Sequence, residues 1–464
     1  MSRELALMPA TELLANYRMK TLSPVEATEA ALARIAELNG HLNAFCLIDD
    51  AAALEAARQS ERRWLAGEPL GLVDGVPTTV KDLVIVKGWP TRRGSKVVPA
   101  NQVAEEDAPA VARLREHGAV LLGKTTTPEF GWKGVTDSPL TGITRNPWNS
   151  QMTPGGSSGG AAVAAATGMG ALHIGTDGGG SIRIPASFTG IVGFKQSFGR
   201  VPAHPLSPFG TLAHLGPMTR TVADTALMLS VLTEPDLRDW YALPPDGRNY
   251  LDGLDDGVKG LRIAFSPTLA GAPVDEEVAA LVAKAAEAFA ELGASLDTTD
   301  PGLPNSYRTF AQHWSPGAAN ALRAFGPEQR QEMDPGLVAI AEEGAAVPIL
   351  DYLAAVKERE AMGVQMNQFH QRWDLLLTPT MPIPAFPAGR ELPAGHPGQR
   401  WMSWTPFTYP FNLTRQPAAT VPCGLTKAGL PVGLQIIGPA YGDALVLRAA
   451  RAFEQARPFT LPAL

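Results

Sequence analysis

The segment from Gly155 to Pro185 constrains this chain most, because it has almost no side-chain bulk. It reads GGSSGGAAVAAATGMGALHIGTDGGGSIRIP, and its only serines are Ser157, Ser158 and Ser181. Glycine lets the backbone approach other atoms closely, and convergent backbone N–H groups can stabilise a developing negative charge. The segment therefore predicts an oxyanion site built around isolated hydroxyl groups.

Lys81 is the candidate base for these hydroxyls. It lies in GVPTTVKDLV, after a turn and a β-branched run, where a buried strand is expected. A serine hydroxyl is a weak nucleophile at neutral pH, and a lysine can activate it only when burial lowers the lysine pKa. A surface lysine paired with Asp82 is the alternative. Serines lined by glycine together with one sequestered lysine favour acyl transfer without histidine.

Other glycine-rich motifs fit this segment less well. Residues 155–159 match G-x-S-x-G, but the nucleophile elbow of α/β-hydrolases follows a strand, whereas residues 146–154 have the composition of a turn. The segment lacks the Gly-Lys-Ser/Thr ending of a phosphate-binding loop, and His173 occupies the last glycine position of a dinucleotide-binding pattern. The remaining histidines show no metal-ligand spacing, so no metal or cofactor is expected.

Composition predicts a soluble, cytoplasmic protein. The chain has 464 residues, 45% of them hydrophobic, and a net charge of −7 with both signs interspersed, so neither nucleic acid nor a membrane is an expected partner. The two cysteines suit a reducing compartment better than a disulfide framework. We find neither a secretory leader pattern nor an apolar run long enough to span a bilayer.

The order of expected elements indicates an α/β fold. Strands at 77–80 and 119–122 flank a helix at 108–117, and a second strand–helix pair is expected at 261–265 and 275–292. Such alternation predicts one large domain with a mostly parallel mixed sheet sandwiched between helices. Residues 1–70 are expected to form a helical N-terminal layer of that domain, and residues 71–464 its core, with a variable substrate-pocket region at about 236–405.

One helix boundary is predicted in detail. Ser23, Pro24 and Glu26 form the pattern of an N-cap, a first-turn proline and a capping-box glutamate. The helix that starts there is expected to end near Leu38, ahead of Asn39-Gly40.

Several segments together resemble the amidase signature family of serine amidohydrolases. They are LSPVEATEAALARIAELNGHLNAF, GVPTTVKD, DAPAVARLREHGAVLLGKTTTPEF, NPWN ahead of GGSSGG, and LPVGLQIIGPAYGDALVLRAA. The resemblance covers nearly the whole chain. It implies the amidase signature fold, no cofactor, a small-molecule amide substrate and a homodimer.

The resemblance also implies residue roles. Ser181 would be the acylated nucleophile, Ser157 the bridging serine after a cis peptide bond, and Lys81 the base. The backbone N–H groups of residues 178–181, those of Gly178, Gly179, Gly180 and Ser181, would hold the oxyanion. Asp177 and Arg183 would hold the turn rather than touch substrate.

Three positions depart from the commonest family pattern. Gly178 replaces a larger residue, His173 occupies a place that is normally small, and Arg415 stands where glycine is usual. None of them removes a catalytic group. We expect His173 to pack beside the core and to take no part in catalysis.

Aromatic residues suggest the substrate class. The segments that line the acyl pocket in similar enzymes favour uncharged aliphatic or aryl amides here. The candidate pocket residues are Phe130, Trp132, Phe209, Trp314 and Trp404, with Trp401 and Phe407 nearby in sequence.

Two other functions compete with a stand-alone amidase. The glutaminase component of a tRNA-dependent amidotransferase uses the same site to free ammonia from glutamine, but such proteins carry Ser-Leu-Asp-Gln ahead of Ile-Gly-Pro, whereas this chain reads TLAHLGP at 211–217. A non-catalytic amide-binding scaffold would not require Lys81, Ser157 and Ser181 together.

Overall fold

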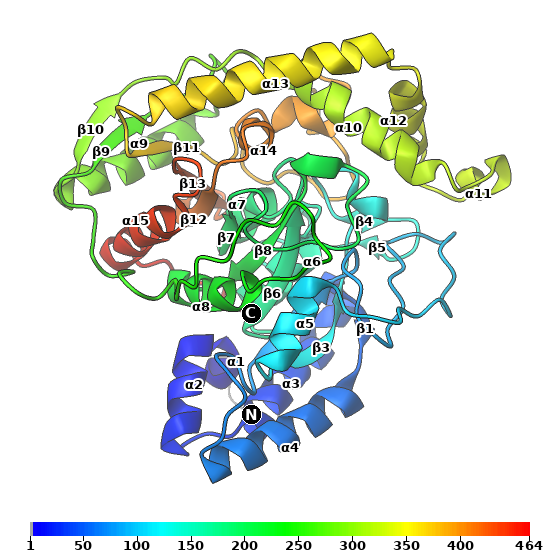
Figure 1. Ribbon diagram of the computed structural model, residues 1–464, viewed down its shortest axis with the longest axis vertical. Helices are drawn as coiled ribbons and strands as arrows, with labels where there is room; N and C mark the ends of the chain where they lie inside the picture. The colour runs from blue at the N-terminus through cyan, green and yellow to red at the C-terminus, as the bar shows by residue number, and fades with distance from the viewer. Residues whose placement is uncertain (1–2) are drawn as a thin grey trace.

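The centre of the chain is an eleven-stranded mixed β-sheet, seen in a computed structural model that describes residues 3–464 (Figure 1). In sheet order the strands are β1 (Phe45–Ile48), β3 (Val120–Thr125), β2 (Pro77–Lys81), β6 (Leu172–Asp177), β8 (His214–Thr219), β7 (Val192–Lys195), β12 (Ala418–Leu425), β13 (Pro431–Ile437), β11 (Leu375–Pro379), β9 (Arg262–Phe265) and β10 (Ser295–Thr298). A small hairpin joins β4 (Asp137–Ser138) to β5 (Gly142–Ile143).

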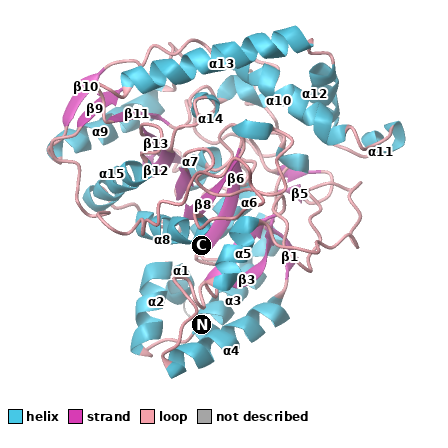
Figure 2. Cartoon of the chain, in the orientation of Figure 1, coloured by secondary structure: helices cyan, strands magenta, loops and turns pink. Residues whose placement is uncertain are grey.

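Helices surround this sheet (Figure 2). They are α1 (Arg3–Leu7), α2 (Ala10–Met19), α3 (Pro24–Leu42), α4 (Asp50–Ala66), α5 (Pro109–Glu116), α6 (Gly159–Thr167), α7 (Arg183–Thr189), α8 (Val222–Leu232), α9 (Glu276–Glu291), α10 (Tyr307–Leu322), α11 (Pro327–Gln331), α12 (Pro335–Ala345), α13 (Ile349–Phe369), α14 (Pro410–Leu413) and α15 (Asp443–Ala456), with short 3₁₀ turns η1 (Glu129–Gly131), η2 (Gly210–Leu212) and η3 (Trp401–Trp404).

The expected mixed sheet between helices is confirmed, but its strands are not mostly parallel. Among residues 3–464, four pairings in this sheet are parallel and six are antiparallel. A parallel pair needs a long crossover, such as the one that carries α5 between β2 and β3, whereas a tight turn makes its strands antiparallel. The turn between β12 and β13 is of the second kind, closed by a hydrogen bond from Gly429 N–H to Thr426 O (2.8 Å).

Apolar layers hold the two faces of the sheet. The largest cluster packs α5, α8, α9 and α15 against one face, with fully buried side chains such as Val80 and Phe289. The alanine-rich helix α6 and α7 cover the other face, where Ala162 and Ile182 are fully buried. Because alanine is small, α6 lies close to the strands that carry the candidate catalytic residues.

The N-terminal residues add more than a helical layer. Ser23 and Glu26 form the predicted capping box at the start of α3, but the helix continues to Leu42 and ends at Asn43, which is left-handed (φ 52°). Gly40 would meet no atom within 4 Å if it carried a Cβ, so nothing at that position stops the helix. The short strand β1 then pairs with β3, which corrects the purely helical description of residues 1–70.

The region between 236 and 405 forms much of the far end of the molecule. Helices α10, α12 and α13 lie together there, opposite the N-terminal helices (Figure 1). Their aromatic and methionine side chains form a second core with Trp314, Trp401 and Met366. The boundaries of a variable pocket region within it stay a prediction.

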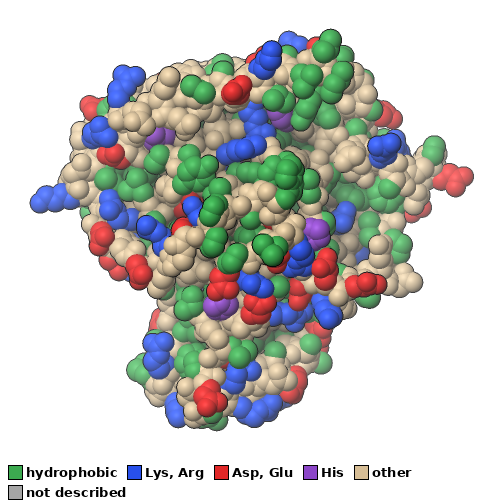
Figure 3. Space-filling view, in the orientation of Figure 1, with side chains coloured by type: hydrophobic (Ala, Val, Ile, Leu, Met, Phe, Trp, Pro, Cys, Tyr) green, Lys and Arg blue, Asp and Glu red, His purple; other side chains and the backbone are tan. Residues whose placement is uncertain are grey.

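Surface features agree with the composition. Figure 3 shows basic and acidic side chains interspersed over the face in view, with no large area of one sign. None of the helices within residues 3–464 is long and apolar enough to cross a membrane. Cys46 and Cys423 are both free thiols.

Candidate active site

Lys81 ends the central strand β2, whose five residues are all buried. Its amine nitrogen lies 2.7 Å from Ser157 Oγ, 2.8 Å from Ser158 Oγ and 2.9 Å from Thr176 Oγ1. Within residues 3–464 no carboxylate forms an ion pair with Lys81. The surface ion pair with Asp82 is therefore excluded, since Asp82 lies against Lys124 instead (3.3 Å).

Burial determines the charge state of this lysine. Desolvation lowers the pKa of Lys81 well below its ordinary value, and the negative charge of Asp177 only partly opposes the shift. An amine with a depressed pKa is neutral at a higher fraction near pH 7 and can accept a proton. Its three hydroxyl neighbours can carry that proton.

Ser157 and Ser158 precede α6 and differ in their surroundings. The Gly156–Ser157 peptide bond is cis, as the family resemblance implies. The hydroxyl of Ser158 donates to Thr176 O (3.1 Å) and accepts from Thr176 N–H (3.1 Å), so it ties two segments together. Ser157 instead lines the main cavity of the structure.

The glycines of this segment are required by close backbone approach. A Cβ on Gly156 would lie 2.6 Å from the carbonyl of Val135, and a Cβ on Gly160 would lie 2.5 Å from Thr126 N. Real Cβ atoms do not come so close to backbone, so any side chain would displace Ser157 and the start of α6. The low side-chain bulk of the segment is thus a packing requirement.

Ser181 lies in the turn between β6 and α7 and lines the same cavity as Ser157. Among the described residues, the N–H groups of Gly178, Gly179 and Ser181 donate no hydrogen bond within the protein. The N–H of Gly180 donates to Asp177 Oδ1 (2.8 Å), which removes Gly180 from the predicted set of oxyanion donors in this structure. Three N–H groups remain beside the Ser181 hydroxyl.

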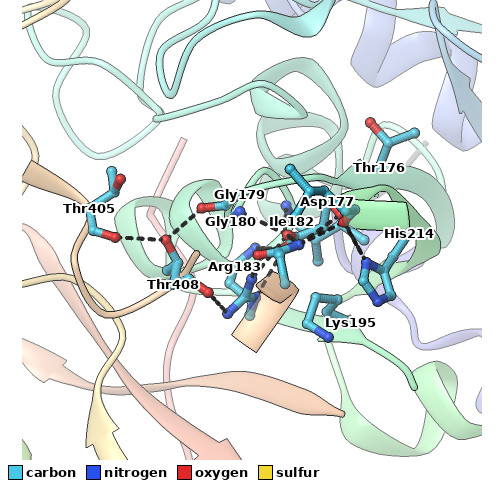
Figure 4. A network of polar contacts seen from close by, with 12 residues as sticks. Thr176, Asp177, Gly179, Gly180, Ile182, Arg183, Lys195, His214, Thr405 and Thr408 are labelled. Carbon is cyan, nitrogen blue, oxygen red and sulfur yellow. Dashed lines mark hydrogen bonds and ion pairs between the residues drawn. The ribbon is translucent and has the colours of Figure 1, made fainter. Parts of the chain in front are cut away.

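An ion pair behind this turn holds it in shape (Figure 4). Arg183 contacts both carboxylate oxygens of Asp177 at 3.0 Å, and both side chains are fully buried. Arg183 also donates to Thr408 O (2.8 Å), and Thr408 Oγ1 donates to Gly179 O (2.7 Å). Burial alone would raise the pKa of Asp177, but the charge of Arg183 holds it below the ordinary value. Asp177 and Arg183 therefore position the glycine turn.

Neither histidine near the site is placed to act as a base. His173 Nδ1 lies 2.8 Å from Thr79 Oγ1, and burial lowers the pKa of His173 to about 3. His214 Nδ1 lies 2.9 Å from Leu212 O, and burial lowers its pKa well below the ordinary value. No group of three His, Cys, Asp or Glu side chains in residues 3–464 could hold a metal ion.

Three of the five predicted pocket residues line the cavity. Phe130, Phe209 and Trp314 do so, and the rings of Phe209 and Trp314 stack 3.8 Å apart. Trp132 and Trp404 do not reach it. Trp132 lies behind Trp314 and accepts its indole N–H at the backbone oxygen (3.2 Å), and Trp404 is buried against Phe188. Their size and chain position predict a pocket role, but neither property reveals the direction of a side chain.

Two parts of this cavity are not predicted from the sequence. The loop at 203–210 supplies one wall, together with Phe198 and Tyr241. Arg93 supplies a guanidinium from the opposite part of the chain. The Arg-Arg step in TRRGS, next to a glycine turn, is the one sequence signal for Arg93.

Comparison with known proteins agrees with this geometry. The family model described as Amidase matches residues 26–447. The chain belongs to the amidase family. This amidase is 40% identical to an acylamidase of Rhodococcus erythropolis, over 97% of this chain and 96% of the relative. It is 37% identical to the A-type component of the glutamyl-tRNA(Gln) amidotransferase of Myxococcus xanthus, over 97% of both chains.

The fold of this amidase also matches solved structures of the family. A bacterial aryl acylamidase of the amidase signature family superimposes with a TM-score of 0.90 at 35% identity, covering 97% of this chain and 96% of that one. The resemblance drawn from sequence motifs is therefore confirmed, and so is hydrolysis of amides as the activity class.

Proposed function

We propose that this enzyme cleaves a carboxylic acid amide through an acyl-enzyme on Ser181, with Ser157 as proton relay and Lys81 as base. One observation carries the proposal: the 2.7 Å contact between Lys81 and Ser157, where Ser157 and Ser181 line a common cavity. The contact connects a lysine of depressed pKa to the reaction space through one hydroxyl.

In the first half-reaction, Ser181 Oγ bonds to the amide carbonyl carbon and passes its proton to Ser157, whose own proton goes to neutral Lys81. The carbonyl oxygen becomes an oxyanion, stabilised by the N–H groups of Gly178, Gly179 and Ser181. The proton then returns through Ser157 to the amide nitrogen, the C–N bond breaks, and ammonia or an amine leaves.

In the second half-reaction, water replaces the departed amine. It loses a proton through Ser157 to Lys81 and attacks the Ser181 ester, and the collapse of the second oxyanion releases the carboxylic acid and restores the Ser181 hydroxyl. No other group needs to change its protonation state.

The cavity supports amides with aliphatic or aryl groups as substrates. Its walls are mostly apolar and include the aromatic residues Phe130, Phe198 and Trp314. Apolar cavities with a few polar groups suit ligands of that kind. The names of two relatives, an acylamidase and an aryl acylamidase, point the same way.

Glutamine hydrolysis for a tRNA-dependent amidotransferase is the second candidate function, favoured by the 37% identity to one such protein. The sequence TLAHLGP at 211–217 argues against it, and so does the apolar cavity. A non-catalytic scaffold would leave the Lys81–Ser157 contact without a purpose.

The experiment is release of ammonia or amine by the purified chain alone. The panel contains glutamine, acetamide, hexanamide, benzamide, an anilide and a cyclic dipeptide. We expect turnover of the apolar amides and none of glutamine. Release from glutamine only, or release only after the other amidotransferase components are added, would replace the first proposal by the second.

A further inference from the structure

The catalytic cavity contains a guanidinium with no counter-ion. Arg93 lines the cavity together with Ser157 and Ser181. Its side chain forms no hydrogen bond and no ion pair within residues 3–464, and its only close contact with a charged or aromatic group is a position 5.9 Å from the centre of the Phe130 ring. Burial lowers the pKa of Arg93, although the charge of Asp82 partly opposes the shift.

The backbone around Arg93 holds this side chain in place. Arg93 has left-handed dihedral angles (φ 55°), which non-glycine residues adopt infrequently. Its carbonyl accepts from Phe130 N–H (2.8 Å), and the N–H groups of its neighbours Arg92 and Gly94 donate to the Asp82 carboxylate (3.2 and 3.3 Å). Asp82 directly follows Lys81, so the turn that carries Arg93 is tied to the catalytic strand.

The nearby carboxylates are already engaged elsewhere. Asp82 is shared by Lys124 and the two N–H groups of the turn. Asp239, the one carboxylate that lines the cavity within residues 3–464, accepts from the N–H groups of Ala203 and Tyr241 (2.9 and 2.8 Å). A partly buried cation without a partner is costly unless a ligand supplies the opposite charge.

We propose that Arg93 selects amide substrates that carry a carboxylate on an otherwise apolar or aromatic body. The proposal rests on the function proposed above and changes one part of it, the expectation that substrates are uncharged. A guanidinium presents paired donors that match the two oxygens of a carboxylate. Phe130 and Leu83 line the cavity with Arg93 and would contact the apolar body of the substrate.

Matched substrate pairs test this inference. In the first pair, N-phenylsuccinamic acid is compared with N-phenylbutanamide, which places the carboxylate on the acyl side. In the second, 4-acetamidobenzoate is compared with 4-methylacetanilide, which places it on the amine side. We expect kcat/KM for one of the acids to exceed that of its neutral partner by roughly tenfold or more, as for a charge-assisted hydrogen bond.

Three variants assign the preference to the guanidinium. Arg93→Gln should lower the ratio of acid to neutral kcat/KM by roughly tenfold, and Arg93→Lys should restore part of it. Arg92→Gln is the control, because Arg92 neighbours Arg93 in the same turn but does not line this cavity. It should leave the ratio unchanged. Equal kcat/KM within both pairs, or a preference that persists in Arg93→Gln, would overturn the proposal.

A binding measurement separates this inference from the proposed function. Ser181→Ala protein is titrated with the same four compounds by calorimetry, alone and combined with Arg93→Gln. Tighter binding of an acid that is lost with Arg93→Gln supports the inference even if the intact chain hydrolyses none of the panel, a result that would count against the proposed function alone. Equal binding of acid and neutral partner counts against the inference alone.

Discussion

The amine nitrogen of Lys81 lies 2.7 Å from the hydroxyl oxygen of Ser157, at a site where both side chains are almost completely buried. The contact joins the end of β2 to the start of α6, two segments that are 76 residues apart in the chain. It brings a desolvated amine within proton-transfer distance of a hydroxyl that faces the cavity.

Removal of either end of the proton relay should abolish turnover. We expect Lys81→Ala and Ser181→Ala each to lower kcat by roughly 10⁴-fold or more, as for members of other catalytic triads. The measurement is steady-state hydrolysis of an anilide, with circular dichroism to verify folding. Lys357→Ala, at an exposed lysine of α13, is the matched control and should keep full activity. Substantial turnover by folded Ser181→Ala would exclude the acyl-enzyme.

The pH dependence should report the titration of Lys81. Its pKa is depressed by burial, so the amine is protonated and inactive as a base below that pKa and neutral above it. We therefore expect kcat/KM to rise about tenfold per pH unit on the acid side and then to level off. The measurement is a pH–rate profile of kcat/KM over the range in which the fold is intact. A profile that stays flat down to about pH 5 would contradict Lys81 as the base, because even a strongly depressed lysine titrates near about pH 5–6.

His173 should be dispensable for the chemistry. Its pKa of about 3 keeps the ring neutral, and its contact with Thr79 lies within the sheet, away from the cavity lining. His173→Ala should keep most of kcat while it lowers the free energy of unfolding by roughly 1–3 kcal/mol, through a lost hydrogen bond and a cavity. Denaturant unfolding and steady-state kinetics check the two parts. A folded His173→Ala protein without activity would refute the histidine-free mechanism.

Gly178 should be required because of Trp314. A Cβ on Gly178 would lie 2.8 Å from Trp314 Cζ3, so Gly178→Ala should push the glycine turn away from the indole and lower kcat/KM by roughly 10–100-fold through loss of an oxyanion donor. The double variant Gly178→Ala, Trp314→Leu removes the clash and should recover part of the activity, which a double-mutant cycle measures.

Gly363→Ala is the control for that substitution. Gly363 lies in α13, and a Cβ there would meet no atom within 4 Å, so activity should not change and the helix should gain about 0.5–1 kcal/mol. Additive effects of Gly178→Ala and Trp314→Leu would show that the two residues do not interact.

The presence of Gly178 in place of a larger residue thus has a structural cause, and a second family departure has one too. Arg415 adopts a left-handed conformation (φ 65°), which explains why glycine is usual at this position. Its guanidinium lies 4.8 Å from the centre of the ring of Phe198, a residue of the cavity wall. The sequence pattern identified both positions as unusual, but only the packing shows which neighbours each one meets.

The sequence by itself determined the chemistry of the site and the class of fold. Lys81, Ser157 and Ser181 could be identified because the reaction demands those residue types, and the glycine run around them excludes other uses. Local signals are also read from sequence alone, as the capping box of Ser23 and Glu26 shows, because a helix N-terminus is stabilised by residues three positions apart.

The tertiary structure decided the direction of side chains and the order of strands. Trp132 and Trp404 turned into the core while Arg93, from a short polar turn, reached the cavity. The pairing of β12 with β7, and of β6 with β8, joins segments far apart in the chain. Such contacts depend on how whole layers pack, which no local residue pattern encodes, and the specificity of the enzyme is set at that level.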